Sequence, residues 1–282
     1  MNCRGIGGGL LAAVVLATTV SGCGAGSGSV PSDCKAKHQF ETLEKGFLTV
    51  SSYTYSPATI VRGDTLEGVE GELLREVAKL ECLEIKLIEQ AAAGVIPAVQ
   101  AGRADLAAGD WYRTRERAKA LNLTDPLYSD AMVLVSEGGT VATVDNVVGK
   151  KVGTFEGNLW NEDMKKLLGG NLKVFPTEAA MFQDLAAGRL QVAIDGAAGA
   201  TNMIKTTRKE NLKMRVPPAD PRVAATSSPG QAGWPHRKGN DAMTKALNED
   251  IASLRQEGVI ARALKKYGLP ESSADVGKPN LL

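Results

Sequence analysis

A short stretch in the first half of the chain concentrates side chains that could bind a charged small molecule. Asp110, Trp111 and Tyr112 stand together, and arginines follow at 113, 115 and 117. A planar guanidinium can donate two parallel hydrogen bonds to one carboxylate, so this stretch could hold an acidic group. The same spacing also suits a basic face in solvent, which is the ordinary role of an arginine cluster. These residues therefore indicate either a carboxylate site or a solvated surface.

The remaining composition offers little for catalysis, metal binding or nucleic-acid binding. The 282 residues include only two histidines, His38 and His236, and four cysteines without a CxxC pair. A histidine base or a zinc motif therefore lacks the residues it needs. The 33 basic and 32 acidic residues give a formal charge of +1, without the basic surface that phosphate backbones require. We expect a globular protein of one large or two medium domains, with no cofactor, no metal and no nucleic-acid partner.

The first residues are typical of an export signal. A short positive start through Arg4 precedes the charge-free run Leu10–Val20, and small residues lead directly to Cys23. The run is shorter than the roughly 20 residues of a membrane span, although a span or a plain signal peptide remains an alternative. Val-Ser-Gly-Cys at 20–23 resembles a bacterial lipobox. We therefore expect a lipoprotein signal peptide over 1–22, a lipid on Cys23, a tether over 23–39, and an extracytoplasmic protein anchored to the bacterial cell membrane.

Removal of the signal peptide changes the cysteine count. With Cys3 cleaved off and Cys23 lipidated, Cys34 and Cys82 remain. The oxidising compartment of an exported chain favours a disulfide between them. The alternative is a pair of free thiols with Cys82 in the core, because spacing alone does not bring two Cα atoms together.

The elements that must position these residues alternate between strand and helix. Apolar runs and 3.6-residue periodicity predict two βαβαβ series followed by two terminal helices. This order indicates parallel sheets covered by helices, with ligands at the carboxyl ends of the strands in a cleft between two units. The expected strands are 47–51, 84–88, 104–108, 151–155, 172–175 and 191–195, and the expected helices are 71–83, 94–101, from about 114, 158–168, 178–187, 240–256 and 259–267.

Several segments in this frame resemble motifs of extracytoplasmic solute-binding proteins of the polar amino-acid type, family 3. Gly-Val-Glu-Gly-Glu-Leu at 68–73 is similar to the family's Gly-Phe-Asp-Val-Asp-Leu, and 95–105 is similar to Ile-Pro-Ala-Leu-x-x-Gly-x-x-Asp. Thr-Arg-Glu-Arg at 114–117 precedes Leu-Thr-Asp-Pro-Leu-Tyr, where the family has Thr-x-Glu-Arg and then Phe-Ser-x-Pro-Tyr. Each motif is short, but their order and spacing hold over about 46–268. Further matches are 46–50, 149–153, 187–189, 247–248 and 266–268.

The resemblance implies an α/β fold, namely a two-lobed, periplasmic-binding-protein-like clamshell of type II. Each lobe would be a mostly parallel sheet flanked by helices, with lobe 1 at 40–130 plus 230–275 and lobe 2 at 131–229. A monomer of this kind closes on an amino acid or a related carboxylate-bearing solute. It then delivers the solute to an ABC permease in the membrane.

The resemblance also assigns the ligand residues of lobe 1. Arg117 matches the family arginine that grips the ligand α-carboxylate, whereas Arg113 and Arg115 are expected in solvent. Tyr112 replaces a small or hydroxyl residue, and Ala92 replaces an aromatic wall whose volume Trp111 could fill. Asp110 precedes them, and Tyr53 and Tyr55 stand where ligand-contacting residues occur.

In lobe 2 the family's Gly-Thr ligand loop becomes Gly-Asn-Leu-Trp at 157–160. Asn158 could cap a helix and direct amide groups at a carboxylate, with Trp160 nearby. Asp195 lies one residue before the position of the family's amino-anchoring aspartate. Because a one-residue shift in a strand reverses the facing, Asp195 is either a ligand residue or a structural turn aspartate.

These departures favour a bulky, aromatic or cationic ligand that carries a carboxylate and is held partly by stacking and cation–π contacts. Two alternatives remain open. One is an enzyme similar to cyclohexadienyl dehydratases, in which Asp110, Glu156 or Asp195 would be the acid or base. The other is a ligand sensor.

Overall fold

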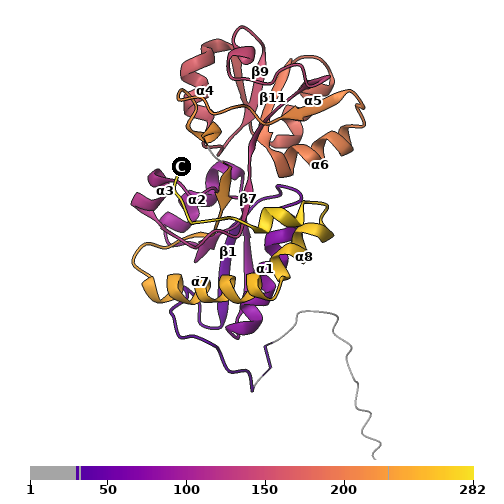
Figure 1. Cartoon of the computed structure of the whole chain (residues 1–282). Helices are drawn as coiled ribbons and strands as arrows, with labels where there is room; N and C mark the ends of the chain where they lie inside the picture. The colour runs from indigo at the N-terminus through magenta and orange to yellow at the C-terminus, as the bar shows by residue number, and fades with distance from the viewer. Residues whose placement is uncertain (1–29, 32, 228) are drawn as a thin grey trace, which may run out of the picture.

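The computed structural model describes residues 30–31, 33–227 and 229–282. The predicted signal peptide at 1–22 and the predicted lipidation at Cys23 lie outside these residues. In the described part, two five-stranded sheets with flanking helices form two lobes, one above the other in Figure 1. The predicted fold class, a two-lobed α/β clamshell, is confirmed.

Lobe 1 is built on the sheet β4-β1-β5-β14-β6. Strand β1 pairs in parallel with β4 and β5, whereas β14 runs antiparallel to both β5 and β6. Its strands are β1 (Phe47–Ser52), β4 (Glu84–Glu89), β5 (Leu106–Ala107), β6 (Asn122–Leu123) and β14 (Pro235–His236). Its helices are α1 (Gly68–Leu80), α2 (Ala92–Gln100), α3 (Arg115–Ala120), α7 (Asp241–Gln256) and α8 (Val259–Lys266).

Lobe 2 is built on the sheet β10-β9-β11-β8-β12. Strand β9 pairs in parallel with β10 and β11, and β8 runs antiparallel to β11 and β12. Its strands are β8 (Met132–Glu137), β9 (Val152–Phe155), β10 (Leu172–Phe175), β11 (Val192–Gly196) and β12 (Leu212–Arg215). Its helices are α4 (Asn161–Leu168), α5 (Glu178–Ala186) and α6 (Ala197–Thr207).

The chain crosses between the sheets on a two-stranded ribbon. Strand β7 (Tyr128–Asp130) leads from lobe 1 to lobe 2, and β13 (Gly230–Ala232) leads back, antiparallel to it. Such a pair of crossing strands can act as a hinge because few residues must change their dihedral angles. Outside the lobes' sheets lie the hairpin β2 (Ile60–Arg62) and β3 (Thr65–Glu67) and the short 3₁₀ turns Asp145–Val147, Gly169–Asn171, Ala224–Thr226 and Glu271–Ala274.

Local geometry explains where the expected helices are displaced. Helix α1 begins at Gly68, whose φ of +92° suits glycine, and ends before Cys82, which has a φ of +54° and turns the chain into β4. The expected start of helix α4 at Asn158 is wrong, since the chain still turns there and the helix begins at Asn161. Helix α6 is absent from the sequence expectation because small residues weaken its apolar pattern, and strand β12 (Leu-Lys-Met-Arg) is absent because charged residues interrupt its apolar run.

The N-terminal side of the described chain is fastened to lobe 1. Cys34 and Cys82 form a disulfide with an S–S distance of 1.98 Å, which confirms the predicted pair. The Lys37 amide donates to the carbonyl of Leu80 at the end of α1. This attachment lies at the end of lobe 1 that points away from lobe 2 (Figure 1).

Candidate functional site

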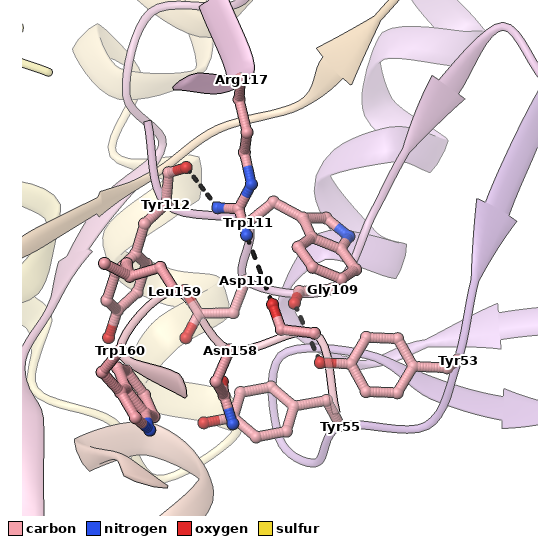
Figure 2. Close-up of a pocket in the computed structure, with 11 residues that line it drawn as sticks. Tyr53, Tyr55, Gly109, Asp110, Trp111, Tyr112, Arg117, Asn158, Leu159 and Trp160 are labelled. Carbon is pink, nitrogen blue, oxygen red and sulfur yellow. Dashed lines mark hydrogen bonds between the residues drawn. The ribbon is translucent and has the colours of Figure 1, made fainter. Parts of the chain in front are cut away.

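A cavity lies between the lobes, at the carboxyl ends of parallel strands (Figure 2). Lobe 1 contributes the loops after β1 and β5 and helix α3, while lobe 2 contributes the loop after β9. The empty space among these residues is about 310 Å³, including the part open to solvent. Strand ends of this kind are the usual ligand position in open α/β sheets. The lining residues are Tyr53, Tyr55, Gly109, Asp110, Trp111, Tyr112, Arg117, Gly157, Asn158, Leu159 and Trp160.

The cavity thus brings together the residues singled out from both lobes, with the exception of Asp195. That side chain is fully buried at the end of β11 and does not line the cavity. Its Oδ1 accepts a hydrogen bond from the Tyr55 hydroxyl at 3.0 Å. Asp195 therefore reaches the cavity only through Tyr55.

Arg117 reaches the cavity from the first turn of α3. The hydroxyl of Thr114 caps this helix by accepting from the Arg117 amide at 3.1 Å. The Arg117 guanidinium donates to the Tyr112 carbonyl at 2.5 Å and to the Gly157 carbonyl of lobe 2 at 3.5 Å. It also lies 4.9 Å from the Trp111 ring centroid. The two lobes therefore touch across the cleft at Arg117.

The electrostatics of Arg117 suit an anionic ligand. Within the described residues, Arg117 forms no ion pair with a carboxylate, and its partners are neutral carbonyls and an aromatic ring. Burial lowers the pKa of Arg117 to about 10, against the opposing effect of nearby Tyr53 and Asp110. A half-buried guanidinium without a counter-charge gains from a ligand carboxylate, which can accept two parallel hydrogen bonds.

The loop that carries Asp110 is fixed by hydrogen bonds to the side chain of Glu70 in α1. The Glu70 carboxylate accepts from the Gly109 amide at 3.1 Å and from the Asp110 amide at 2.6 Å. It also accepts from the Tyr128 hydroxyl and the Trp234 indole. Burial raises the pKa of Glu70, and these four hydrogen bonds oppose that rise. Glu70 is therefore fully occupied in shaping the loop.

Asp110 itself carries an unsatisfied oxygen. Its backbone has a φ of +57°, a left-handed conformation that aspartate tolerates better than most residues. Its side chain is buried, and Oδ1 has no hydrogen-bond partner among the described residues. Burial, followed by the charges of Asp130 and Glu70, raises the pKa of Asp110 well above its usual value. A cationic ligand group at this oxygen would favour the carboxylate.

Asp110 is one of four buried carboxyl groups that we call the acidic cluster: Asp110, Asp130, Glu178 and Asp195. Burial raises the pKa of Asp195 to about 7. Burial and the neighbouring Asp195 carboxyl group raise the pKa of Glu178 well above its usual value. Asp130 accepts from the Tyr112 hydroxyl at 2.8 Å. No lysine or arginine of the described chain forms an ion pair with the cluster, and Glu178 Oε1 and Asp195 Oδ2 have no partner there. The carboxyl groups beneath the tyrosines therefore hold their protons more readily than exposed carboxyl groups do, and a cation bound nearby would favour their charged forms.

Five of the eleven residues that line the cavity are aromatic (Figure 2). The ring centroid of Tyr53 lies 5.8 Å from that of Trp111 and 6.0 Å from that of Tyr55. The rings of Tyr53 and Tyr55 are stacked. On the other side, Tyr112 meets Trp160 edge-on at 6.4 Å. Such rings supply apolar contact and faces for cations.

Two expectations about neighbouring residues are wrong. Asn158 caps no helix: its side-chain amide donates to the Phe155 carbonyl at 3.2 Å. Arg113 is not a solvated arginine, because it donates to the carbonyls of Thr124 and Asn280 and lies partly buried. Asn158 thus bonds the end of β9, and Arg113 bonds the loop after β6 and the C-terminal segment.

Sequence reasoning missed the residues beneath the cavity, above all Glu70, Asp130 and Glu178. Glu70 lies inside the segment 68–73 that resembles a family motif, so its position was a usable signal. The contact of Glu178 with Asp195 joins α5 to the end of β11 through the tertiary fold. The described residues also contain no helix that is long and apolar enough to cross a membrane.

The sequence model of the bacterial extracellular solute-binding proteins, family 3, matches residues 48–270. The chain is 26% identical over 230 residues to the L-cystine-binding protein TcyJ of Escherichia coli (strain K12), covering 79% of this chain and 83% of the relative. It is 25% identical over 223 residues to the lysine/arginine/ornithine-binding periplasmic protein of that strain, covering 76% and 84%.

Solved structures agree at the level of the fold. An ancestral arginine-binding protein bound to arginine superposes with a TM-score of 0.70 at 23% identity. The match covers 79% of this chain and 99% of that protein.

Proposed function

The chain belongs to the bacterial extracellular solute-binding proteins of family 3, and from that premise we propose that its cavity captures a cationic amino acid for an ABC importer. The observation that carries the proposal is a guanidinium without an anionic partner and a buried carboxyl oxygen without a donor, both lining one cavity. The Arg117 guanidinium has no carboxylate partner in the described chain, and Asp110 Oδ1 has no donor there. An α-amino acid supplies a carboxylate for Arg117 and an ammonium group that donates to Asp110 and favours its charged form.

Arg117 binds the ligand α-carboxylate. Its guanidinium already faces the cavity and is fixed by the Tyr112 and Gly157 carbonyls, so little side-chain entropy remains to be lost. The bond to Gly157 also joins the lobes, so a ligand at Arg117 favours the closed arrangement. That closed form is what a permease can recognise.

Asp110 and the acidic cluster accept the positive groups of the ligand. Asp110 lines the cavity and takes one cation directly, while Asp195 lies behind Tyr55 with Glu178 beside it, where a bound cation would favour their charged forms. A second cation on the ligand side chain would add attraction that a neutral or acidic side chain lacks. The relatives named for lysine, arginine and ornithine support this preference.

The aromatic wall holds the body of the ligand. Tyr53 and Trp111 on one side and Trp160 on the other offer ring faces to an extended or planar side chain. We propose ligand contact for eight of the nine residues that the sequence indicates, with the ninth, Asp195, acting through Tyr55. Lipidation at Cys23 and a monomeric, membrane-tethered protein complete the proposal, since both fit delivery to a permease.

The test is isothermal titration calorimetry on protein that has been unfolded in guanidinium chloride and refolded to remove bound ligand. The panel is L-arginine, L-lysine, L-histidine, L-cystine, L-glutamine and L-glutamate. We expect one of the cationic amino acids to bind tightest and L-glutamate at least 100-fold more weakly. Equal or tighter binding of L-glutamate would overturn the charge argument, and binding of no amino acid would overturn the function.

Asp110→Asn isolates the acidic side of the site. We expect this variant to bind the preferred amino acid at least tenfold more weakly, because a neutral amide replaces a charged acceptor. Asp64→Asn is the matched control, since Asp64 is exposed in the β2–β3 turn. Equal affinities for the two variants would contradict the assignment of Asp110.

The two alternatives from the sequence each have a direct test. An enzyme of the cyclohexadienyl dehydratase kind would turn over prephenate-like acids, and we expect no turnover. A sensor would act without an importer, whereas we expect genes for a permease and an ATPase beside the gene of this protein.

A further inference from the structure

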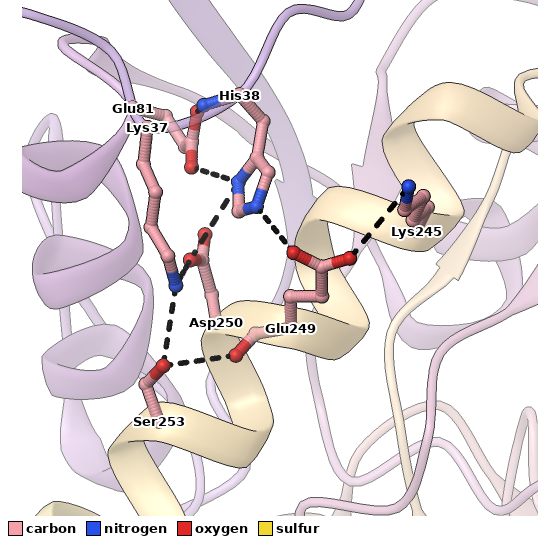
Figure 3. Close-up of polar contacts among 7 residues, drawn as sticks. All are labelled: Lys37, His38, Glu81, Lys245, Glu249, Asp250 and Ser253. Carbon is pink, nitrogen blue, oxygen red and sulfur yellow. Dashed lines mark hydrogen bonds and ion pairs between the residues drawn. The ribbon is translucent and has the colours of Figure 1, made fainter.

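A second cluster of polar side chains lies in lobe 1, outside the cavity (Figure 3). It joins three separate segments: His38 of the N-terminal side, Glu81 after α1, and Asp250 of α7. One ligand atom from each of these residues lies within 4.8 Å of the other two. Glu81 and Asp250 are buried, and His38 is 16% exposed at its side chain. The set offers one imidazole nitrogen and two carboxylates.

The hydrogen bonds of this cluster leave one buried acceptor without a partner. Asp250 Oδ1 accepts from Lys37 Nζ at 3.0 Å, but Oδ2 is buried and has no partner among the described residues. The Asp250 side chain is fully buried, and its carboxylate points toward His38 and Lys37 in Figure 3. A buried, unsatisfied carboxylate oxygen is costly unless a cation or a donor reaches it.

The orientation of the His38 ring independently indicates a metal site. Its Nδ1 faces Glu81 Oε1 at 2.6 Å and Asp250 Oδ1 at 3.9 Å, while its Nε2 faces Glu249 Oε2 at 2.8 Å. A histidine that binds a metal through one nitrogen generally donates its other N–H to a carboxylate, which fixes the tautomer and the ring. Glu249 stands in that position relative to His38.

We propose that His38, Glu81 and Asp250 form a zinc site that joins the N-terminal segment to α1 and α7. His38 would coordinate through Nδ1, Glu81 and Asp250 through one oxygen each, and a water molecule would complete a tetrahedral set. One nitrogen with two carboxylates favours zinc over magnesium or calcium, which prefer oxygen ligands alone. Lys37 would keep its ion pair with Asp250 Oδ1, and Glu249 would remain the positioning residue of His38.

The experiment titrates zinc chloride into the mature chain, expressed without a histidine tag and freed of metal with EDTA. We expect one equivalent to bind, with a rise in the melting temperature because zinc binds only the folded site. Cobalt chloride gives a second readout, since tetrahedral cobalt absorbs strongly in the visible region. Magnesium chloride at the same concentration should bind more weakly by at least 100-fold.

Three variants, each with one side chain replaced by glutamine, distinguish zinc binding at this cluster from zinc binding elsewhere on the protein surface. His38→Gln should weaken zinc binding by at least 100-fold, and Glu249→Gln by 10–100-fold. His236→Gln is the matched control, because His236 is the other histidine and bonds Trp234 and Thr244 within lobe 1. Binding of the preferred amino acid by each variant shows that the protein is folded.

Two results would overturn the proposal. One is the absence of zinc binding at one equivalent, which would make the cluster a network of ion pairs only. The other is zinc binding that survives in His38→Gln or disappears in His236→Gln. Neither result bears on the proposed capture of an amino acid, because that site shares no residue with this one.

Discussion

Arg117→Ala tests the central contact of the proposed ligand site. Truncation of one partner of a hydrogen-bonded charge pair costs about 2–5 kcal/mol in binding free energy. Arg117 is half-buried, so we expect the lower part of that range, about 2–3 kcal/mol. Because about 1.4 kcal/mol corresponds to a tenfold change, the Kd should rise roughly 30- to 150-fold. Isothermal titration calorimetry with the preferred amino acid measures this change.

The same variant also loses its bonds to the carbonyls of Tyr112 and Gly157, so a loss of affinity alone does not identify the carboxylate contact. A ligand without the carboxylate resolves this point, for example agmatine in place of L-arginine. If Arg117 binds the carboxylate, agmatine should bind the wild type and Arg117→Ala with Kd values within about threefold. Wild type and Arg117→Ala, each measured with L-arginine and with agmatine, form a thermodynamic cycle. Its coupling energy should then equal the 2–3 kcal/mol estimated above.

Arg115→Ala is the matched control, because Arg115 is exposed on the same helix. We expect its affinity to stay within a factor of two of the wild type. The reasoning is refuted if Arg117→Ala binds the amino acid like the wild type, or if it loses amino acid and agmatine equally. Equal losses would mean that Arg117 shapes the cleft without touching the ligand carboxylate.

Other predictions concern stability. Burial raises the pKa of Asp195 to about 7, so the folded protein keeps a proton that the unfolded chain loses at about pH 4. This contribution to stability is complete below pH 4 and disappears as the pH rises to 7. In Asp195→Asn, the melting temperature of the ligand-free protein should therefore depend less on pH between pH 4 and pH 7, and at pH 8 it should be higher than that of the wild type. Cys34→Ser removes a cross-link that spans 48 residues, and denaturant unfolding should show a loss of about 4 kcal/mol. Gly230→Ala would place a Cβ 2.3 Å from the Tyr112 ring, so calorimetry should show a lower melting temperature and weaker ligand binding, whereas Gly170→Ala meets open space and should change neither.

The sequence predicts the elements that carry a strong apolar period. The expected helix 240–256 corresponds to α7 at Asp241–Gln256, and the expected strand 172–175 corresponds to β10 at Leu172–Phe175. Helix α6 escaped prediction because its first turns are alanines and glycine, which carry no apolar stripe. The start of α4 was misplaced because Asn158 resembles a capping residue, but its amide bonds the Phe155 carbonyl instead.

The residues of the candidate site also differ in whether the sequence predicts them. Arg117 follows from a local motif, Trp111 follows from the aromatic position that Ala92 leaves vacant, and the structure places both at the cavity. The other two members of the acidic cluster, Asp130 and Glu178, do not follow from any local pattern, because they meet the site only once the crossing strand β7 and helix α5 are packed beneath it. The position of Asp195 depended on the exact end of β11, a boundary that periodicity leaves open by a residue or more.

The fastening of the N-terminal side to lobe 1 has a mechanical consequence. A force applied along residues before Cys34 enters the molecule through the disulfide and the end of α1, and passes into the sheet of lobe 1. The crossing strands β7 and β13 carry none of that load, because they lie between the sheets rather than along its path. We therefore expect a rotation of lobe 2 against lobe 1 to cost the same energy whether the N-terminal side of the chain is slack or under tension.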